Sequence, residues 1–336
     1  MKKHANIPIF IPHLGCPNQC VFCNQRSISG VSEFDIGTVR GEIETALSTI
    51  PKGTEAEIAF FGGSFTGIDY GLMCELLKIA YSYLKAGRVC SIRCSTRPDY
   101  INEKILDTLS RYGVKVIELG LQSSSDEVLL VSKRGHNSEQ EKAACRMIRE
   151  RGFTLVGQMM LGLPHSTRER EIETARFIAS VADGARIYPT IVFNGTELCE
   201  MARRSDYEPL SLDEAVTRGA DVLEVFIDAG VPVIRIGLCA SDNLASEKTY
   251  FAGPNHPAIG ELIESEIYYR RICKEINQRA TPLTGALSLC VARGALSKTV
   301  GQRKKNVCRL KEKYGISRVK IEESDDLFGY DVKILT

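Results

Sequence analysis

The sequence predicts an α/β protein whose first 240 residues form a full or partial (β/α) barrel, followed by a small basic α+β extension. Short apolar runs alternate with helix-length amphipathic stretches over more than 200 residues. Such alternation is the pattern of parallel βαβ units. Polar and glycine-rich segments follow several of the expected strands, and chemistry at the carboxyl ends of successive strands is typical of (β/α) barrels.

The expected strands are rich in β-branched or aromatic residues and are bounded by Gly, Pro, Asn or Asp. They lie at 7–14, 55–61, 88–95, 115–122, 153–161, 185–193 and 231–238. Helical stretches between them lie at 35–49, 69–86, 138–151, 167–181 and 211–229. Near residue 240 the alternation gives way to a proline-containing loop and one amphipathic helix, so we expect two domains, 1–240 and 241–336.

Bulk composition indicates a soluble globular protein, since 43% of the 336 residues are hydrophobic and 25% are charged. No window approaches the roughly 18 consecutive apolar residues of a membrane span. The amino terminus carries no recognisable export signal, so the expected location is the cytoplasm. Disulfides rarely persist there, and nine of the 12 cysteines are scattered, as expected for small buried hydrophobic residues.

Three cysteines, Cys16, Cys20 and Cys23, form a C-x3-C-x2-C motif near the amino terminus. A fully ligated iron–sulfur cubane uses four cysteine thiolates, so three ligands on a short loop leave one iron open. Zinc is the competing interpretation, but zinc sites usually need a second ligand pair, and only His13 lies nearby. Three merely buried cysteines are disfavoured by the polar loop residues between them.

With Phe22 before its third cysteine, this motif resembles the radical S-adenosylmethionine (SAM) superfamily. The resemblance implies that the three cysteines hold a [4Fe–4S] cluster, whose open iron binds the methionine end of SAM. It also implies reductive cleavage of SAM to a 5′-deoxyadenosyl radical. The cofactor contacts that it implies are Phe22, Gly62, Gly63, Ser64, Ser95, Gln122, Arg134, Gln158 and Tyr188.

Some of these contacts have defined roles in the resemblance. Gly62 and Gly63 present backbone carbonyls to the methionine ammonium, and Ser64 stands where the family more often has an acid. Gln122 falls at a ribose contact. Arg134 suits the methionine carboxylate because a guanidinium is a planar fork, with Lys133 as its rival. No catalytic residue is assigned.

Further segments extend the resemblance over residues 5–240: "FFGGSFTG", "STRPDYI", "KRGH", "GLP" and "IYPTIVFNGTEL". As a set they resemble the radical SAM domain of the Elongator catalytic subunit, and more distantly the oxygen-independent coproporphyrinogen oxidases. The resemblance implies an enzyme that modifies tRNA-like RNA and takes electrons from a donor such as ferredoxin or flavodoxin. The segment after 240 is too short for an acetyltransferase-like domain and has no glycine-rich pyrophosphate loop, so we expect that domain to be absent.

The tail has a feature of its own, because residues 293–320 contain ten Lys or Arg and one acid in a chain of net charge +1. Within it, residues 297–321 resemble the core of a KH module, in which a glycine-containing loop clamps nucleic-acid backbone before a helix. The second glycine of that loop is missing here. Arg303, Lys304, Lys305 and Lys311 are the candidate RNA contacts, and a solvated basic helix face is the alternative.

Three hypotheses follow from these patterns. The first is a radical SAM enzyme that modifies RNA, and the second is a radical SAM enzyme acting on a small molecule, as coproporphyrinogen oxidase does. The third is an iron–sulfur RNA-binding or regulatory protein that does not cleave SAM. The SAM-facing segments speak against the third, and nothing in the sequence indicates an oligomeric state.

Overall fold

The computed structural model describes residues 4–11, 14–16, 20–24, 34–238, 249–279, 283 and 285–335. His13, the polar residues 17–19 of the cysteine loop and Cys239 therefore lie outside the described residues. The chain forms two compact units, one of residues 1–210 and 225–255 and one of residues 211–224 and 256–336. The domain boundary expected near residue 240 stays a prediction.

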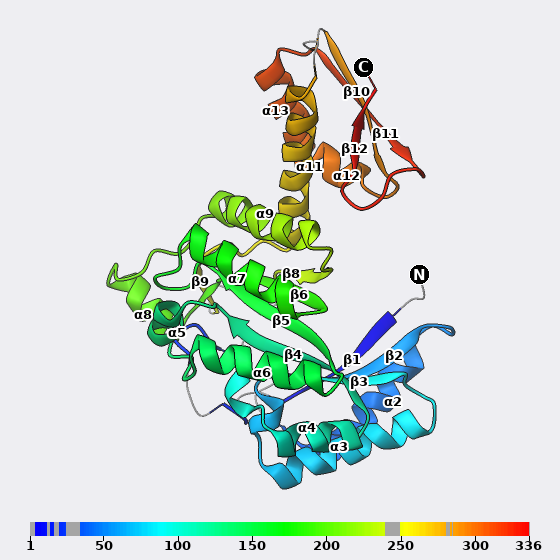
Figure 1. Ribbon diagram of the computed structural model, residues 1–336, viewed down its shortest axis with the longest axis vertical. Helices are drawn as coiled ribbons and strands as arrows, with labels where there is room; N and C mark the ends of the chain where they lie inside the picture. Colours follow the sequence, from blue (N-terminus) through cyan, green and yellow to red (C-terminus); the bar gives the residue numbers. More distant parts are fainter. Residues whose placement is uncertain are drawn as a thin grey trace. The chain divides into compact units, whose positions relative to one another are not determined.

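The first unit is built on a seven-stranded parallel sheet in the order β1-β2-β3-β4-β5-β6-β8. Its strands are β1 (His4–Phe10), β2 (Glu55–Phe61), β3 (Ser91–Thr96), β4 (Val114–Gln122), β5 (Thr154–Leu161), β6 (Gly184–Pro189) and β8 (Val233–Ile236). The sheet curls into an open half-barrel with helices along its outer face (Figure 1). This arrangement confirms the partial barrel that the sequence predicts.

The helices follow the strands in chain order. They are α2 (Val39–Thr49), α3 (Tyr70–Lys85), α4 (Glu103–Arg111), α5 (Asp126–Val131), α6 (Ser138–Glu150), α7 (Arg168–Val181), α8 (Glu197–Arg203) and α9 (Leu212–Asp228). Short polar side chains cap several of them; Asn102 accepts from the amide of Ile105, and Asn137 forms a capping box with Gln140. Helices α2, α3, α4, α6 and α7 each contact a strand of the sheet.

Alternation along each strand explains which side faces the helices. The outward positions are apolar and almost fully buried, as Ile58 and Phe60 are in β2 and Ile117 and Leu119 are in β4. Several inward positions of the central strands carry polar or charged side chains: Glu57, Arg93, Glu118, Gln158 and Arg186. The inner face of the sheet is therefore more polar than its helix-covered outer face.

Two strand predictions need correction. The strand expected at 7–14 begins at His4 and ends at Phe10. The strand expected at 185–193 is two strands, because β6 ends at Pro189, which has no N–H to continue the ladder. Its remainder, β7 (Val192–Phe193), pairs antiparallel with β9 (Tyr250–Ala252) instead.

The second unit contains a three-stranded sheet in the order β11-β10-β12, with β10 and β11 parallel. Its elements are α11 (Ile259–Asn277), β10 (Ala286–Ala292), α12 (Leu296–Val300), α13 (Lys305–Tyr314), β11 (Arg318–Ser324) and β12 (Val332–Ile334). Apolar side chains of α11, including Ile272 and Ile276, pack on Leu287 and Leu289 of β10. Strand, two helices and parallel strand thus follow one another around the basic loop 301–304.

No helix among the described residues is both long and apolar enough to cross a membrane.

Asn306 fixes the start of α13 within this unit. Its Nδ2 donates to the carbonyl oxygen of Ser265 at 2.8 Å, to Ser265 Oγ at 3.0 Å and to the carbonyl oxygen of Thr299 at 3.2 Å. The side chain is 2% exposed, so no water replaces these bonds. One buried amide therefore joins α11, α12 and α13.

We predict that Asn306→Ala lowers the free energy of unfolding of the second unit by about 1–3 kcal/mol, because it leaves buried polar groups without partners. Urea denaturation with hydrogen exchange of the β10 amides measures the change. Asn277→Ala is the control, since exposed Asn277 accepts a single bond from Tyr314. Equal losses in the two variants would contradict the prediction.

Candidate cluster and SAM site

The cysteine segment is held against the loop that follows β2. A Cβ at Gly15 would lie 1.9 Å from the carbonyl oxygen of Ser64, and one at Gly67 would lie 2.4 Å from the carbonyl oxygen of Gly15. Only glycine therefore permits this approach of the two backbones. The contact places Cys16 beside Ser64, whose backbone bonds to it.

The second half of the motif is anchored by main-chain bonds. Val21 donates its N–H to Ser132 at 3.3 Å, and its carbonyl oxygen accepts from Leu198 at 2.8 Å. Val21 is buried, and Phe22 packs on its apolar cluster. The Cys23 N–H donates to the Cys20 carbonyl at 3.0 Å, so Cys20 and Cys23 lie on one tight turn.

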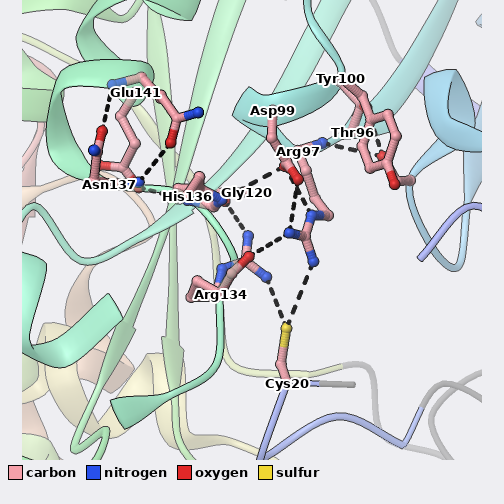
Figure 2. Close-up of polar contacts among 12 residues, drawn as sticks. Cys20, Thr96, Arg97, Asp99, Tyr100, Gly120, Arg134, His136, Asn137 and Glu141 are labelled. Carbon is pink, nitrogen blue, oxygen red and sulfur yellow. Dashed lines mark hydrogen bonds and ion pairs between the residues drawn. The ribbon is translucent and has the colours of Figure 1, made fainter. Parts of the chain in front are cut away.

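Two buried arginines converge on Cys20 (Figure 2). Arg134 Nη1 lies 3.3 Å and Arg97 Nη1 lies 3.9 Å from Cys20 Sγ. Arg134 also donates Nη2 to the carbonyl oxygen of Gly120 at the end of β4. Two guanidinium groups at one sulfur place positive charge where an anionic ligand would be stabilised.

Arg134 is the better placed of the two rival cations. Its residue is 5% exposed and its guanidinium is at Cys20. The Lys133 side chain is 56% exposed and pairs with Glu197 at 2.6 Å. The geometry thus favours Arg134 over Lys133 for an anionic group beside the cysteines.

The loop that contains Gly62 comes directly after β2, the strand that pairs with β1. Gly62 has φ +99°, and a Cβ there would meet the backbone N of Ile11 at 3.0 Å. Ser64 is buried, with its hydroxyl 2.9 Å from Thr96 Oγ1 and 3.4 Å from the N–H of Arg97. The Ser64 hydroxyl therefore joins the loop after β2 to the end of β3.

Several buried polar atoms at this end of the sheet have no hydrogen-bond partner within the described chain. They are Ser95 Oγ, Gln122 Oε1 and Arg134 Nε. Gln122 adopts a left-handed conformation, φ 70°, and its Nε2 would lie 2.9 Å from a Cβ at Gly120. Unpartnered buried groups are costly, so Ser95 of β3, Gln122 at the end of β4 and the Arg134 guanidinium beside Gly120 fit a polar ligand.

Gln158 and Tyr188, the other two predicted cofactor contacts, belong to a charged network on the inner face of the sheet. Gln158 Nε2 donates to Glu118 at 3.0 Å, and Glu118 also accepts from Arg93 and Arg186 at 2.7 Å each. The Tyr188 hydroxyl lies 3.4 Å from Arg186, and burial raises its pKa. In the structure, Gln158 and Tyr188 therefore interact mainly with protein charges.

A chain of polar side chains leads from Arg97 to helix α6 (Figure 2). Asp99 takes two bonds of 2.9 Å from Arg97, and its Oδ1 lies 3.5 Å from His136 Nδ1. Burial acts to raise the pKa of Asp99, but His136 and Arg97 outweigh it and lower the pKa to about 2. His136 Nε2 lies 3.0 Å from Glu141 Oε1, and burial raises the pKa of Glu141 to about 7 although His136 opposes the change.

The residues present fit a cluster and SAM, on the evidence of the two guanidinium groups at Cys20 and the unpartnered atoms beside them. Burial raises the pKa of Cys16, although a backbone hydrogen bond from Ser64 and the charge of Arg97 oppose the change. Within the described ranges, no three His, Cys, Asp or Glu side chains are grouped so that they could hold a metal ion. The sequence motif, rather than a gathered ligand set, therefore carries the cluster assignment.

Sequence reasoning missed four of the polar residues that meet near the cysteines or in the Glu118 network: Arg97, Asp99, His136 and Glu118. Arg97 and Asp99 stand in "STRPDYI" and His136 stands in "KRGH", two segments that carry the family resemblance. The sequence does offer one signal. Arg97 comes soon after the expected strand at 88–95, and Asp99, of opposite charge, follows two positions later. This signal does not identify the partners, because Arg97 and Cys20 are 77 positions apart.

Comparison with known families agrees with this geometry. Residues 10–178 match the radical SAM superfamily, and residues 182–269 match the radical SAM C-terminal domain. The fold is similar to that of Elp3 from Methanocaldococcus infernus with an N-terminal deletion, with a TM-score of 0.64 at 21% identity over 80% of this chain and 64% of that one.

Sequence relatives include a tRNA uridine(34) acetyltransferase of Methanocaldococcus infernus, 33% identical over 38% of this chain and 25% of the relative. Human Elongator complex protein 3 is 33% identical over 42% of this chain and 27% of the relative. The chain thus spans about a quarter of the length of these curated relatives.

The raised pKa of Glu141 predicts a pH-dependent stability. Its folded pKa of about 7 lies above the ordinary value of 4.5, so between these values the folded protein holds the proton more strongly than the unfolded chain. The free energy of unfolding therefore falls as pH rises through this window, with a slope of at most about 1.4 kcal/mol for each pH unit. His136, Arg134 and Asp126 are the charged or titratable groups that act on it, besides the neighbouring thiol of Cys145.

We expect Glu141→Gln to flatten this fall, so that the variant gains stability relative to wild type between pH 5 and pH 8. Urea midpoints at the two pH values measure the difference. Glu139→Gln on the same helix is the control, because the Glu139 side chain is 76% exposed. An unchanged pH profile in Glu141→Gln would refute the assignment of the proton to this carboxyl group.

Proposed function

This chain belongs to the radical SAM superfamily, and we propose that it uses SAM radical chemistry to modify RNA, with a tRNA as substrate. Family members bind a [4Fe–4S] cluster and SAM. When bound, these groups supply a 5′-deoxyadenosyl radical that removes a hydrogen atom from the substrate. The protein's part is to bind, orient and shield these groups.

In this proposal Cys16, Cys20 and Cys23 hold the cluster and leave one iron for the amino and carboxylate groups of SAM. Arg134 has Nε still unpartnered in the described chain and suits the carboxylate. Gln122 Oε1 and Ser95 Oγ are further unpartnered atoms for polar groups of the nucleoside. Backbone at Gly62 and Gly63 serves the ammonium, and Phe22 the adenine.

The observation that carries the RNA proposal is the basic loop of the second unit. It lies between α12 and α13, in a strand–helix–helix–strand arrangement of the kind in which KH modules bind nucleic acid. Several of the unit's cations are already paired: Lys298 with Glu264, Lys305 with Asp213 and Arg309 with Glu266.

By contrast, Arg303, Lys304 and Lys311 are exposed and have no acidic partner among the described residues. Unpaired cations on a loop and an adjoining helix suit phosphate groups, which dominate nucleic-acid affinity. The name of one relative, a tRNA uridine(34) acetyltransferase, supports tRNA as the RNA concerned.

A cleavage assay tests the proposal. Anaerobically reconstituted protein with dithionite and SAM should release 5′-deoxyadenosine, and total tRNA should increase the yield. Cys20→Ala should keep its far-UV circular dichroism, because the motif lies on a loop, and should release no product. Product that is indifferent to tRNA would favour a small-molecule substrate, and no product from the cluster-loaded protein would refute SAM cleavage.

Charge reversal in the loop tests the RNA surface separately. We predict that Arg303→Glu with Lys304→Glu weakens tRNA binding and lowers the slope of log affinity against log salt by about 2, one for each lost phosphate contact. Cleavage of SAM without RNA should be unchanged. The matched control is Lys305→Glu, because Lys305 already pairs with Asp213 at 3.1 Å. Equal tRNA affinity in wild type and the double variant would remove the loop from the RNA proposal.

A further inference from the structure

Four side chains that the proposed function leaves without a role connect Cys20 to helix α6. They are Arg97, Asp99, His136 and Glu141, which form a continuous chain of contacts (Figure 2). None is a motif cysteine or a predicted SAM contact. All belong to the first unit, so the chain lies within one compact body.

Arg97 stands at the inner end of this chain, and its donors are directed to separate acceptors. Nε and Nη2 each donate to a different oxygen of Asp99 at 2.9 Å, and Nη2 also donates to the carbonyl oxygen of Arg134. Nη1 is left facing Cys20 Sγ at 3.9 Å. A bidentate pair fixes the plane of a guanidinium, so Asp99 determines where the Arg97 charge lies.

Asp99 also lies against His136, whose Nδ1 is 3.5 Å from Asp99 Oδ1 and makes no hydrogen bond among the described residues. The low pKa of Asp99, about 2, keeps it ionised at neutral pH. His136 lies between Asp99 and Glu141, and the side chains of His136 and Glu141 are both 0% exposed. Helix α6 carries Glu141 in its first turn, behind the capping box of Asn137. The chain therefore ties the Arg97 guanidinium to a rigid helix start.

A purely structural ion-pair network does not account for this arrangement. Arg97 and Arg134 place two positive charges beside one sulfur, while Asp99 is the only acid that either contacts in the described residues. Two like charges held together away from water are unfavourable without an anion between them. In the proposed function Arg134 takes the SAM carboxylate, so Arg97 is the guanidinium left to face the negative charge of the cluster thiolates at Cys20.

We propose that Asp99, His136 and Glu141 are positioning residues that hold the Arg97 guanidinium beside Cys20, where its charge makes the iron–sulfur cluster easier to reduce. Nearby charge and hydrogen bonds to sulfur are among the factors that set the potential of such clusters. The proposal rests on Cys20 as a cluster ligand, which is part of the proposed function. It adds no step to the reaction and concerns only the potential at which the cluster accepts its electron.

The test is a redox titration of reconstituted protein, followed by electron paramagnetic resonance and matched for iron content. Arg97→Gln should lower the equilibrium constant for reduction at least tenfold, which is about 59 mV for a one-electron couple. Arg97→Lys keeps the charge and should recover most of the lost potential. His136→Gln should change the potential in the same direction by less.

Positioning is separated from a direct effect by a double-mutant cycle. If His136 acts through Arg97, then His136→Gln causes no further change in the Arg97→Gln background. Arg88→Gln and His165→Gln are matched controls, because each breaks an exposed ion pair, with Glu44 and with Glu127. Both should keep the wild-type potential.

An iron-loaded Arg97→Gln variant with the wild-type potential would overturn the proposal, as would an effect of His136→Gln on the potential that persists without Arg97. If Arg97→Gln fails to load, Arg97→Lys and His136→Gln decide: a wild-type potential in His136→Gln overturns the proposal, and a lowered one supports it. A wild-type protein that binds no cluster would instead refute the proposed function itself.

Discussion

The burial of positive charge beside one cysteine sulfur constrains the carboxyl end of the barrel. Arg97 and Arg134 are both almost fully buried, and a buried guanidinium has to be paired or fully hydrogen-bonded. Arg97 requires Asp99, which places an acid two positions after an arginine in "STRPD". Arg134 donates to the carbonyl oxygen of Gly120. Glycine suits this position, because a Cβ there would lie 3.5 Å from Arg134 Nη2 and 2.9 Å from the Gln122 side-chain amide. Residues from separate segments of the sequence therefore bind the guanidinium groups of Arg97 and Arg134.

Deeper in the barrel the same physical rule has a different outcome. Glu118 accepts from Arg93 and Arg186, and Glu57 accepts from Arg93 at 2.6 Å, so acids and arginines balance one another there. At the cysteine end the arginines exceed the acid that they contact. The balanced network leaves only Arg186 Nε without a partner among the described residues, whereas an unbalanced one favours an anion. This difference distinguishes the Glu118 network, to which Gln158 donates, from the cysteine end of the barrel.

Sequence patterns predict what depends on local periodicity and spacing. Apolar alternation along the chain predicts the strands of the sheet, and the cysteine spacing indicates the family. The role of Ser64 could not be foreseen, because its hydroxyl bonds to Thr96, 32 positions away. The split of 185–193 depends on an antiparallel partner, β9, that no local pattern marks. Contacts of long sequence separation decide such features, and a single sequence does not display them.

The basic loop 301–304 differs from the two-glycine loop of a KH module, and its structure shows what replaces the second glycine. Arg303 and Lys304 have φ values of 52° and 61°, left-handed conformations that cost a non-glycine residue about 1–2 kcal/mol. They persist because Gly301 and buried Asn306 fix the loop from both sides; a Cβ at Gly301 would lie 3.1 Å from the Asn306 N–H nitrogen. The missing second glycine therefore leaves the turn intact and adds two exposed cations to it. A glycine loop admits phosphates close to its backbone, whereas this one offers side-chain charges. In the RNA complex that we propose, affinity for tRNA should therefore depend more steeply on salt than with a two-glycine loop.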